Sequence, residues 1–306
     1  MQKAESSYNG MLAVFKEEGF TSNDVVAKLR GILHMKKIGH TGTLDPAATG
    51  VLPVCLGKGT KMISLLEDTD KTYRCKCKLG VLTDTEDMTG NVVETGSTEG
   101  ITKDRIIKEL ESFKGRYMQV PPMYSAKKVN GRKLYELARE GVEIERKPCE
   151  VFIKSISADS FDLSDDIFEF TVECSKGTYI RSLCRDLGER LGTKASMLKL
   201  VRTKACGISI SDALKLSEIE ELAKSGEISK RMISIDKVFS EYDEIRAGNA
   251  EEDKSVRNGN VLRVSLPDGR YRVYLSDGTF AAIYEVRNKK AQLCGYFLTQ
   301  TNLIKA

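Results

Sequence analysis

The clearest absences from this 306-residue sequence concern membranes, secretion and disulfide bonds. It contains no run of about 18 apolar residues, so we expect no membrane-spanning helix. The opening segment, MQKAESSYNG, lacks the apolar core of a secretory signal, and we therefore expect none. The eight cysteines are scattered along the chain, which suits a reducing compartment better than a disulfide framework. These absences predict a cytoplasmic protein.

A strong net charge is also lacking, because the formal charge at pH 7 is only +4. Its distribution is uneven, since residues 176–204 hold eight basic side chains against Asp186 and Glu189. Such a window is typical of a surface that neutralises RNA phosphates, and on charge alone equally typical of a solvated helix face. The basic residues are Lys176, Arg181, Arg185, Arg190, Lys194, Lys199, Arg202 and Lys204.

The cysteines do not form a recognisable metal-ligand pattern. Residues 72–79 alternate between apolar and polar side chains, which predicts a half-buried strand. Tyr73, Cys75 and Cys77 fall on its apolar face, where cysteine packs as a small apolar residue. Because the second pair of ligands is missing, we expect no metal site at Cys75 and Cys77.

The most informative segment of the chain is residues 39–61, GHTGTLDPAATGVLPVCLGKGTK. Its repeated glycines and prolines predict a tightly folded loop rather than a long helix or a plain strand. At its centre Asp45 presents a single carboxylate, followed by the stiff residue Pro46. The alternative is that Asp45 and Pro46 only begin a turn or a helix, as its N-cap and first residue.

Periodicity predicts the elements around this loop. Residues 21–33 read as a helix that Thr21 and Asp24 cap, and a second helix begins at Thr102. Residues 83–100 read as a polar loop whose acids Asp84, Glu86 and Asp87 are solvated rather than bound to a cation. Residues 168–175 form an alternating strand, and the helix that follows the turn at Gly177 has Arg181 at its start.

The chain divides into two predicted domains. Residues 1–235 form the larger one, with a basic and aromatic insertion at 121–147. Residues 240–306 form a small β-rich unit, with short strands at 260–266, 271–275 and 279–286 separated by Pro-Asp-Gly and Ser-Asp-Gly turns.

Asp45 lies in GHTGTLDP, which resembles the G-H-x-G-x-L-D-P signature of the TruB family of pseudouridine synthases, the bacterial tRNA pseudouridine-55 synthases. Four more segments resemble family elements in the same order along the chain. They are KEEGFTSND (16–24), DKTY (70–73), PPMYSAKKVNGRKLYELAREG (121–141) and GTYIRSL (177–183). Five ordered matches of this kind are not expected by chance.

The resemblance implies an α+β fold with a mixed, mainly antiparallel central sheet, flanking helices and a small C-terminal β-barrel-like PUA domain. This last domain would bind RNA or serve only structure. The implied activity isomerises a uridine in the T-arm of tRNA, at expected position 55, by cleaving its N-glycosidic bond and joining C5 to C1′. No cofactor and no metal are implied. The implied partner is the T-stem-loop of tRNA, without a membrane or an obligate protein partner, and the implied state is a monomer.

The family motifs assign three catalytic residues by resemblance. Asp45 is the catalytic carboxylate, whether it attacks the base, attacks C1′ or removes a proton from the sugar. Arg181 is its ionic partner, because a guanidinium can grip a carboxylate with two bonds, although a phosphate contact is the alternative. Tyr73 stacks on the target uracil and its hydroxyl assists loss of the C5 proton, unless it is only a core aromatic.

Further residues are assigned to substrate binding by the same resemblance. His40 packs against displaced bases rather than serving only as a structural hydrogen-bonder, and Leu200 packs on the other side of the uracil. Tyr179 of GTYIRSL also contacts substrate. The basic residues Lys16, Lys61 and the Lys127–Lys133 cluster bind the RNA backbone. The sequence departs from the family near Ser196, Val201 and Arg202, where a histidine and one arginine of a pair are missing, so backbone contacts are in doubt there.

Two other functions remain open from the sequence. The basic window and the β-rich tail would suffice for a non-catalytic protein that binds or folds tRNA, although such a protein has no need of a caged carboxylate. A hydrolase could use Asp45 with Asp70, or the acids at 84–87 with a metal. The sequence shows no paired carboxylates at a set spacing, which disfavours the hydrolase.

Overall fold

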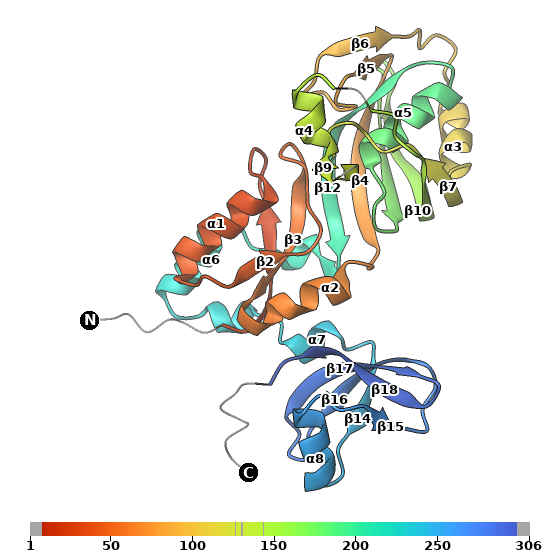
Figure 1. The fold of residues 1–306 in the computed structure, drawn as a ribbon. Coiled ribbons are helices and arrows are strands. Elements are labelled where there is room, and N and C mark those ends of the chain that lie inside the picture. Colours follow the sequence, from red (N-terminus) through yellow and green to blue (C-terminus); the bar gives the residue numbers. More distant parts are fainter. Residues whose placement is uncertain (1–7, 126, 130, 143, 299–306) are drawn as a thin grey trace.

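The computed structural model describes residues 8–298 apart from residues 126, 130 and 143, and it contains two separate main sheets (Figure 1). The larger sheet has nine strands and the smaller, nearer the C-terminus, has five. Within the described part of the chain, no helix has the length and apolar character needed to cross a membrane.

The nine-stranded sheet is almost entirely antiparallel. Its one parallel pairing joins β3 to β12, which brings residues 49 and 50 beside residues 201 and 202. The strands follow the order β1 (Gly10–Lys16), β3 (Thr49–Leu56), β12 (Ala195–Ala205), β4 (Lys71–Leu79), β11 (Ile167–Cys174), β10 (Cys149–Asp162) and β7 (Gly115–Gln119), with β2 (Ile38–His40) paired to β3 and β13 (Ile208–Ser209) paired to β12. The mixed, mainly antiparallel sheet expected from the sequence is confirmed.

Helices cover the two halves of this sheet separately. Helices α1 (Ser22–Leu33) and α6 (Leu216–Lys224) share one apolar cluster with β1 and β3. Helices α3 (Lys103–Glu111) and α5 (Ile180–Arg190) share another with β4, β10 and β11. The shorter elements are η1 (Gly57–Met62), α2 (Ile63–Leu66), η2 (Ile210–Asp212), η3 (Ile228–Arg231) and α7 (Ile235–Val238).

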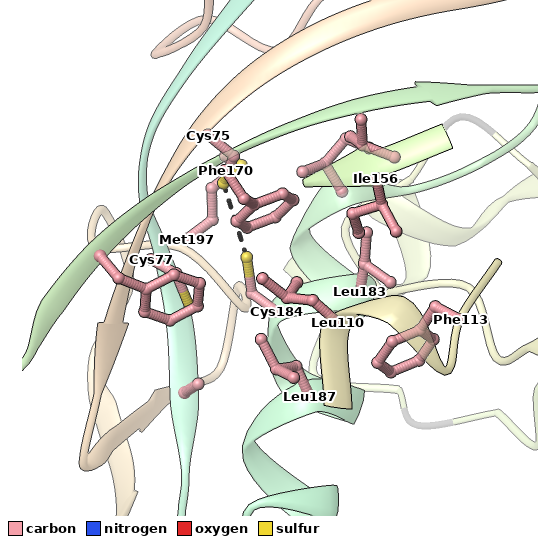
Figure 2. Packing of buried hydrophobic residues seen from close by; sticks show 14 of the residues in the cluster. Cys75, Cys77, Leu110, Phe113, Ile156, Phe170, Leu183, Cys184, Leu187 and Met197 are labelled. Carbon is pink, nitrogen blue, oxygen red and sulfur yellow. Dashed lines mark hydrogen bonds between the residues drawn. The ribbon is translucent and has the colours of Figure 1, made fainter. Parts of the chain in front are cut away.

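The predicted amphipathic elements are confirmed. Helix α1 begins after Thr21, whose hydroxyl accepts from the Asp24 amide while the Asp24 carboxylate accepts from the Thr21 amide. Strand β4 buries Cys75 and Cys77 fully, and Figure 2 shows both near Cys184, whose Sγ lies 3.6 Å from that of Cys75. Burial raises the pKa of Cys75 and Cys77 well above the usual thiol value, which fits their prediction as core residues.

Two predicted loops are partly wrong. Residues 39–61 include the eight-residue strand β3 (Thr49–Leu56), in which Pro53 pairs with Ala13 and accepts a hydrogen bond from the Thr41 amide. Only residues 41–48 form the loop. Residues 83–100 are not simply a polar loop either, because β5 (Val81–Thr83) and β6 (Val92–Thr95) form a hairpin.

The insertion at 121–147 carries its own small secondary-structure elements. It contains the hairpin of β8 (Lys128–Val129) and β9 (Arg132–Lys133), followed by α4 (Leu134–Arg139). In the predicted basic cluster at 127–133, residue 130 and the side chains of Lys128 and Lys133 lie outside the described part of the structure.

The β-rich C-terminal unit is present, but only some of its strands were predicted. Figure 1 shows its sheet curled on itself, and its strand order is β14 (Asp243–Arg246), β16 (Gly269–Tyr274), β17 (Phe280–Arg287), β18 (Lys290–Tyr296) and β15 (Leu262–Arg263), with helix α8 (Ala250–Arg257) alongside. Ile283 and Phe297 of this unit join an apolar cluster with Met62 and Leu66 of the larger body. The two bodies therefore share buried apolar surface.

Gly50 lies where two strands of the large sheet approach each other closely. Its φ is +112°, and a Cβ placed there would lie 2.2 Å from the carbonyl oxygen of Arg202 on β12. The close approach of β3 and β12 therefore requires glycine for two reasons, backbone conformation and space.

We expect Gly50→Ala to lower the free energy of unfolding by about 3 kcal/mol or more, from a strained φ and a backbone clash together. Gly226, with φ +73° and nothing within 4 Å of the added Cβ, isolates the conformational part, and Gly226→Ala should cost about 1 kcal/mol. Urea unfolding of both variants measures the difference. Equal losses would show that the approach of β3 to β12 relaxes freely.

Candidate active site

Asp45 lies in the 41–48 loop, between β2 and β3. Hydrogen bonds from two buried side chains, Lys16 and Ser22, hold this loop in place. The Lys16 ammonium donates to the Pro46 carbonyl at 3.1 Å and to the Phe20 carbonyl at 2.6 Å. The Ser22 hydroxyl accepts from the Leu44 amide at 2.9 Å. The residues on both sides of Asp45 are therefore tied to the amino-terminal segment of the chain.

Arg202 ties the two ends of the same loop together. Its Nη2 donates to the Gly42 carbonyl at 3.0 Å and its Nε to the Val51 carbonyl at 2.8 Å. The side chain is almost completely buried. Since buried carbonyls need donors, a long cation that reaches two of them closes the loop on the sheet.

Arg181 grips the Asp45 carboxylate with two nitrogens. Its Nε lies 2.9 Å from Oδ2 and its Nη2 donates to Oδ1 at 3.2 Å. The Arg181 side chain is 6% exposed, whereas that of Asp45 is 36% exposed. The predicted pairing of these two residues is therefore present, and it leaves one side of the carboxylate open to an incoming group.

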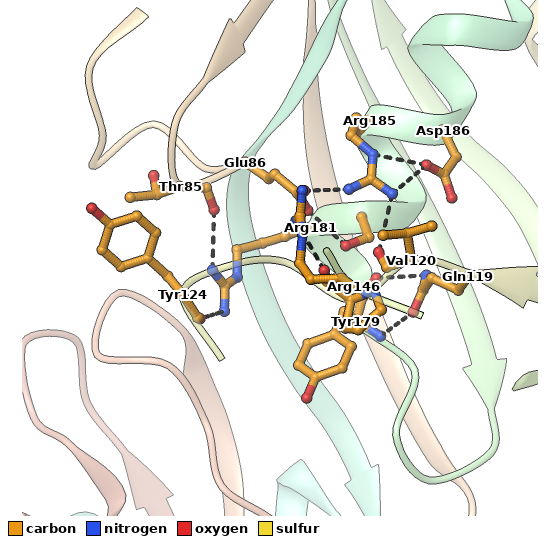
Figure 3. A network of polar contacts seen from close by, with 12 residues as sticks. Thr85, Glu86, Gln119, Val120, Tyr124, Arg146, Tyr179, Arg181, Arg185 and Asp186 are labelled. Atoms are coloured by element: carbon orange, nitrogen blue, oxygen red, sulfur yellow. Dashed lines mark hydrogen bonds and ion pairs between the residues drawn. The ribbon is translucent and has the colours of Figure 1, made fainter. Parts of the chain in front are cut away.

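The Arg181 guanidinium is itself held from behind. Nη1 donates to the Thr85 carbonyl at 3.0 Å, and Nη2 donates to the Tyr124 carbonyl at 2.9 Å (Figure 3). The same Nη2 also donates to Asp45 Oδ1. The Asp87 carboxylate lies 3.9 Å from Nε. Because these acceptors use the donors on every side, the arginine has one orientation toward Asp45.

Tyr73 and Leu200 lie on the sheet beside this pair. Tyr73 is opposite Arg202, and Leu200 is opposite Cys75, so both side chains share one face of β4 and β12. Burial raises the pKa of the Tyr73 hydroxyl, Arg202 opposes this rise, and the negative charge of Asp45 adds to it. The phenol therefore stays protonated at neutral pH and lies within electrostatic reach of Asp45.

His40 ends β2, immediately before the loop. It is half-buried, and within the described structure its Nδ1 is buried without a hydrogen-bond partner. Burial lowers the pKa of His40, and the positive charge of Arg202 lowers it further. The imidazole is therefore neutral at pH 7 and has an unused polar atom next to the site.

Tyr179 caps the start of α5 with its backbone rather than its side chain. The Gln119 side chain accepts from the Tyr179 amide at 2.8 Å and donates to its carbonyl at 3.0 Å. In Figure 3 the Tyr179 ring points away from this polar network. Gln119 thus fixes the peptide two residues before Arg181 and leaves the ring available.

Lys16 is wrongly predicted as an RNA-backbone contact, because it is completely buried and donates to three carbonyls within the protein. Burial lowers its pKa to about 8, and the negative charge of Asp45 opposes that shift. Lys61 is exposed, but its ammonium donates to the Tyr296 carbonyl at 2.9 Å, so it joins the two bodies of the protein.

The basic window at 176–204 does not form one phosphate-binding stripe. Arg181 and Arg202 are buried, and Arg185 lies between two carboxylates inside the protein. Lys176 and Lys194 form ion pairs with acids of neighbouring segments. Much of this positive charge therefore organises the protein itself, and in the described structure only Arg190, Lys199 and Lys204 of the window are exposed without an ion pair.

The prediction of solvated acids at 84–87 is wrong for two of the three residues. Glu86 and Asp87 are buried; Glu86 binds Ser182 and Arg185, and Asp87 binds Thr85 and Thr89. Across the described residues, no group of three or more His, Cys, Asp or Glu side chains has the arrangement of a metal site.

Arg202 and Glu86 are the two residues near the site whose importance the sequence did not reveal. The available signal for Arg202 was that it is the one arginine present where the family pattern has a pair. For Glu86 the sequence offered no such signal beyond its position among other acids, because its partners lie about a hundred positions further along the chain.

Two sizeable cavities, of about 940 and 610 Å³, lie between α1 and α6 and beside α7, and neither is lined by Asp45, Tyr73 or Arg181. An oriented carboxylate beside a phenol, a leucine and a neutral histidine can act on a flat group presented by a large partner, such as a base turned out of a nucleic acid.

Comparison with known proteins agrees with this geometry. A family model for the N-terminal domain of TruB family pseudouridylate synthases matches residues 30–180, and one for the C-terminal domain of tRNA pseudouridylate synthase B matches residues 181–245. A Clostridium perfringens (strain 13 / Type A) tRNA pseudouridine synthase B is 44% identical over 287 residues, which cover 90% of this chain and 94% of the relative. A Bacillus pumilus protein of the same name is 39% identical over 297 residues, covering 93% and 95%.

Solved structures show the same fold at much lower identity. A chain in the crystal structure of a Cbf5-Nop10-Gar1 complex has a TM-score of 0.72 and 21% identity, and the match covers 95% of this chain and 86% of that chain. A chain in an archaeal box H/ACA sRNP Nop10-Cbf5 complex has a TM-score of 0.70 at 20% identity, covering 98% and 89%.

We expect His40 to titrate below its ordinary pKa of 6.5, because burial and Arg202 both disfavour its charged form. Since the unfolded chain then binds the proton more readily, this residue lowers stability as the pH falls below 6.5. Proton NMR titration measures the midpoint, and His40→Gln assigns its signal against that of His34. A midpoint at or above 6.5 would contradict the buried, neutral imidazole.

Proposed function

The chain belongs to the TruB family of pseudouridine synthases and isomerises a uridine of tRNA to pseudouridine, and from this premise we propose that Asp45 is its catalytic carboxylate. The observation that supports this assignment is the two-bond grip of Arg181 on Asp45 within the GHTGTLDP segment. A carboxylate that only began a turn would not need a buried guanidinium aimed at both its oxygens.

The reaction requires a carboxylate but no change of redox state. The N1–C1′ bond breaks, the uracil turns, and a C5–C1′ bond forms while C5 loses its proton. Attack on the base, attack on C1′ and removal of a sugar proton all need an immobile oxygen facing the sugar linkage. The loop fixed by Lys16 and Arg202, together with the guanidinium of Arg181, supplies that oxygen in Asp45.

Tyr73 and Leu200 are proposed to hold the uracil between them. Turning the base out of the RNA stack costs a few kcal/mol, and stacking on an aromatic ring returns about 1–3 kcal/mol. The rest must come from sugar and phosphate contacts. Because its pKa is raised by burial, Tyr73 acts as a neutral phenol and assists loss of the C5 proton through its hydroxyl rather than as a phenolate.

His40 and Tyr179 are proposed to contact the RNA around the flipped nucleotide. His40 is neutral and half-buried, so the exposed part of its ring can pack against a displaced base without bringing a charge to it. Tyr179 has its backbone fixed by Gln119, which leaves its ring as a stacking surface.

The proposed substrate element is the T-arm of tRNA, with the uridine at position 55 as target. The insertion at 121–147 lies beside Arg181 and is proposed to bind the RNA backbone. We assign residues 1–235 to the catalytic domain and residues 240–306 to a PUA-like RNA-binding domain. We further infer a monomer that needs no protein partner, because the contacts that hold Asp45 all come from one chain. The scattered cysteines favour a cytoplasmic location, and a reaction without redox change requires no redox cofactor.

We expect Asp45→Asn to keep its affinity for tRNA and to lose at least about 10³-fold in single-turnover rate, because the amide cannot replace the ionised oxygen. Filter binding and rapid quench with an unmodified tRNA transcript measure the two quantities. Asp70→Asn, which changes an exposed acid of the neighbouring DKTY segment, serves as the control and should remain active. Normal turnover by Asp45→Asn would remove the carboxylate from the mechanism.

Mapping pseudouridine in the reacted transcript tests the substrate assignment. We expect modification confined to the T-arm, with replacement of the position-55 uridine by cytidine abolishing it, and no effect of a chelator. Binding without any pseudouridine would favour the alternative of a non-catalytic tRNA-binding or tRNA-folding protein. Strong inhibition by the chelator would instead favour a metal-dependent reaction.

A further inference from the structure

Glu86 is a buried acid that the mechanism above does not use. It lies in the tight turn between β5 and β6, is 6% exposed, and has a φ of +61°, a left-handed conformation that costs a residue with a side chain about 1–2 kcal/mol. Strained backbone conformations of this kind cluster at functional sites, and here one coincides with a buried carboxylate. Glu86 is therefore a candidate for a role near Asp45.

The carboxylate of Glu86 connects helix α5 to the insertion (Figure 3). The Ser182 hydroxyl donates to Oε2 at 2.6 Å, and Arg185 forms an ion pair with Oε1. The Arg146 guanidinium, at the far end of the insertion, lies 3.9 Å from the same oxygen. One buried charge therefore attracts two arginines that come from separate segments.

Both arginines also hold the beginning of the insertion. Arg185 donates to the Val120 carbonyl at 3.1 Å, and Arg146 donates to the Pro121 carbonyl at 3.0 Å. Three residues after Pro121, the Tyr124 carbonyl accepts from Arg181. Residues 120–124, which we call the stem of the insertion, are thus attached to three arginines, one of which is the partner of Asp45.

The backbone of Glu86 acts on Arg181 from the other side. The carbonyl of Thr85, the preceding residue, accepts from Arg181 Nη1 at 3.0 Å. The Glu86 carbonyl accepts from the Met197 amide at 3.0 Å, and the Met88 amide donates to the Met197 carbonyl at 3.0 Å. These bonds fix the turn on β12, so the left-handed residue aims the Thr85 carbonyl at the guanidinium.

We propose that Glu86 is a positioning residue that fixes the orientation of Arg181 toward Asp45, through the Thr85 carbonyl on one side and through Arg185, Arg146 and the stem on the other. The proposal rests on the proposed function of Asp45 and Arg181. It predicts that the charge of Glu86 matters for the chemical step more than for tRNA affinity.

The charge rather than the shape of Glu86 is the important property. Burial works to lower the pKa of Arg185, yet the charges of Glu86 and Asp186 outweigh this and raise it. Without Glu86 the buried Arg185 keeps a single carboxylate partner, Asp186, which lies next to it on α5 and away from the turn. Arg185 and Arg146 would then hold the stem less firmly.

Glu86→Gln keeps the size of the side chain and removes only its charge. We expect its single-turnover rate with the T-arm transcript to fall about tenfold, since a small displacement of an oriented catalytic group has effects of at least this size. Its tRNA dissociation constant should stay within about twofold of the original value. Glu94→Gln removes a 52% exposed acid from the same hairpin and should leave both quantities unchanged.

Arg146→Gln provides a second test at a position that tolerates substitution better. The Arg146 side chain is 27% exposed, and without it the Glu86 carboxylate still has Arg185 as an ionic partner. We expect a rate loss of about threefold that is not additive with Glu86→Gln in the double variant. The rate of Arg146→Gln alone decides the proposal if Glu86→Gln does not fold.

Three results would overturn the proposal. They are an unchanged rate in Glu86→Gln, an unchanged rate in Arg146→Gln, and a loss confined to tRNA affinity, which would make Glu86 an anchor for RNA binding alone. Asp45→Asn, measured in parallel, separates this failure from failure of the proposed function: if Asp45→Asn is inactive, the catalytic carboxylate stands whatever Glu86 does.

Discussion

The ion pair between Asp45 and Arg181 is the interaction on which the rest of the site depends. A half-exposed carboxylate is normally mobile and well hydrated, and a surface ion pair would do little to change that. Here the guanidinium is buried, bonds both carboxylate oxygens, and has its other donors taken by the Thr85 and Tyr124 carbonyls. Its orientation is therefore fixed before any substrate arrives, which fixes the carboxylate as well.

Buried and partly buried cations hold the backbone around this site, as Arg181 holds the Asp45 side chain. Lys16 and Arg202 each reach two or more carbonyls around the 41–48 loop, and Arg185 and Arg146 reach carbonyls at the start of the insertion. Irregular backbone near a reactive group leaves carbonyls without partners, and long basic side chains satisfy them from a distance. This use of positive charge explains why several basic residues of the 176–204 window are not available to RNA phosphates.

Local patterns in the sequence predicted the elements whose signals are local. Helix α1, strands β4 and β11 and the start of α5 all follow from periodicity and capping residues within a few positions. Strand β3 was missed because glycine and proline interrupt strands in most sequences, whereas here the close approach of β12 requires the glycine at position 50. Glu86 and Lys16 were misjudged for a related reason, since their partners lie in other segments and burial cannot be read from charge.

The five sequence segments that resemble the family come together around this ion pair, and each supplies one residue or contact. The first supplies Lys16 under the loop, the second Asp45, the third Tyr73 on the adjoining strand, the fourth the Tyr124 carbonyl, and the fifth Arg181. Because Arg181 Nη2 is shared between Asp45 Oδ1 and the Tyr124 carbonyl, any movement of the insertion also moves a bond to the carboxylate. If the insertion binds RNA as proposed, that contact and the orientation of the Asp45 carboxylate share this one nitrogen atom, which would link substrate binding to the chemical step.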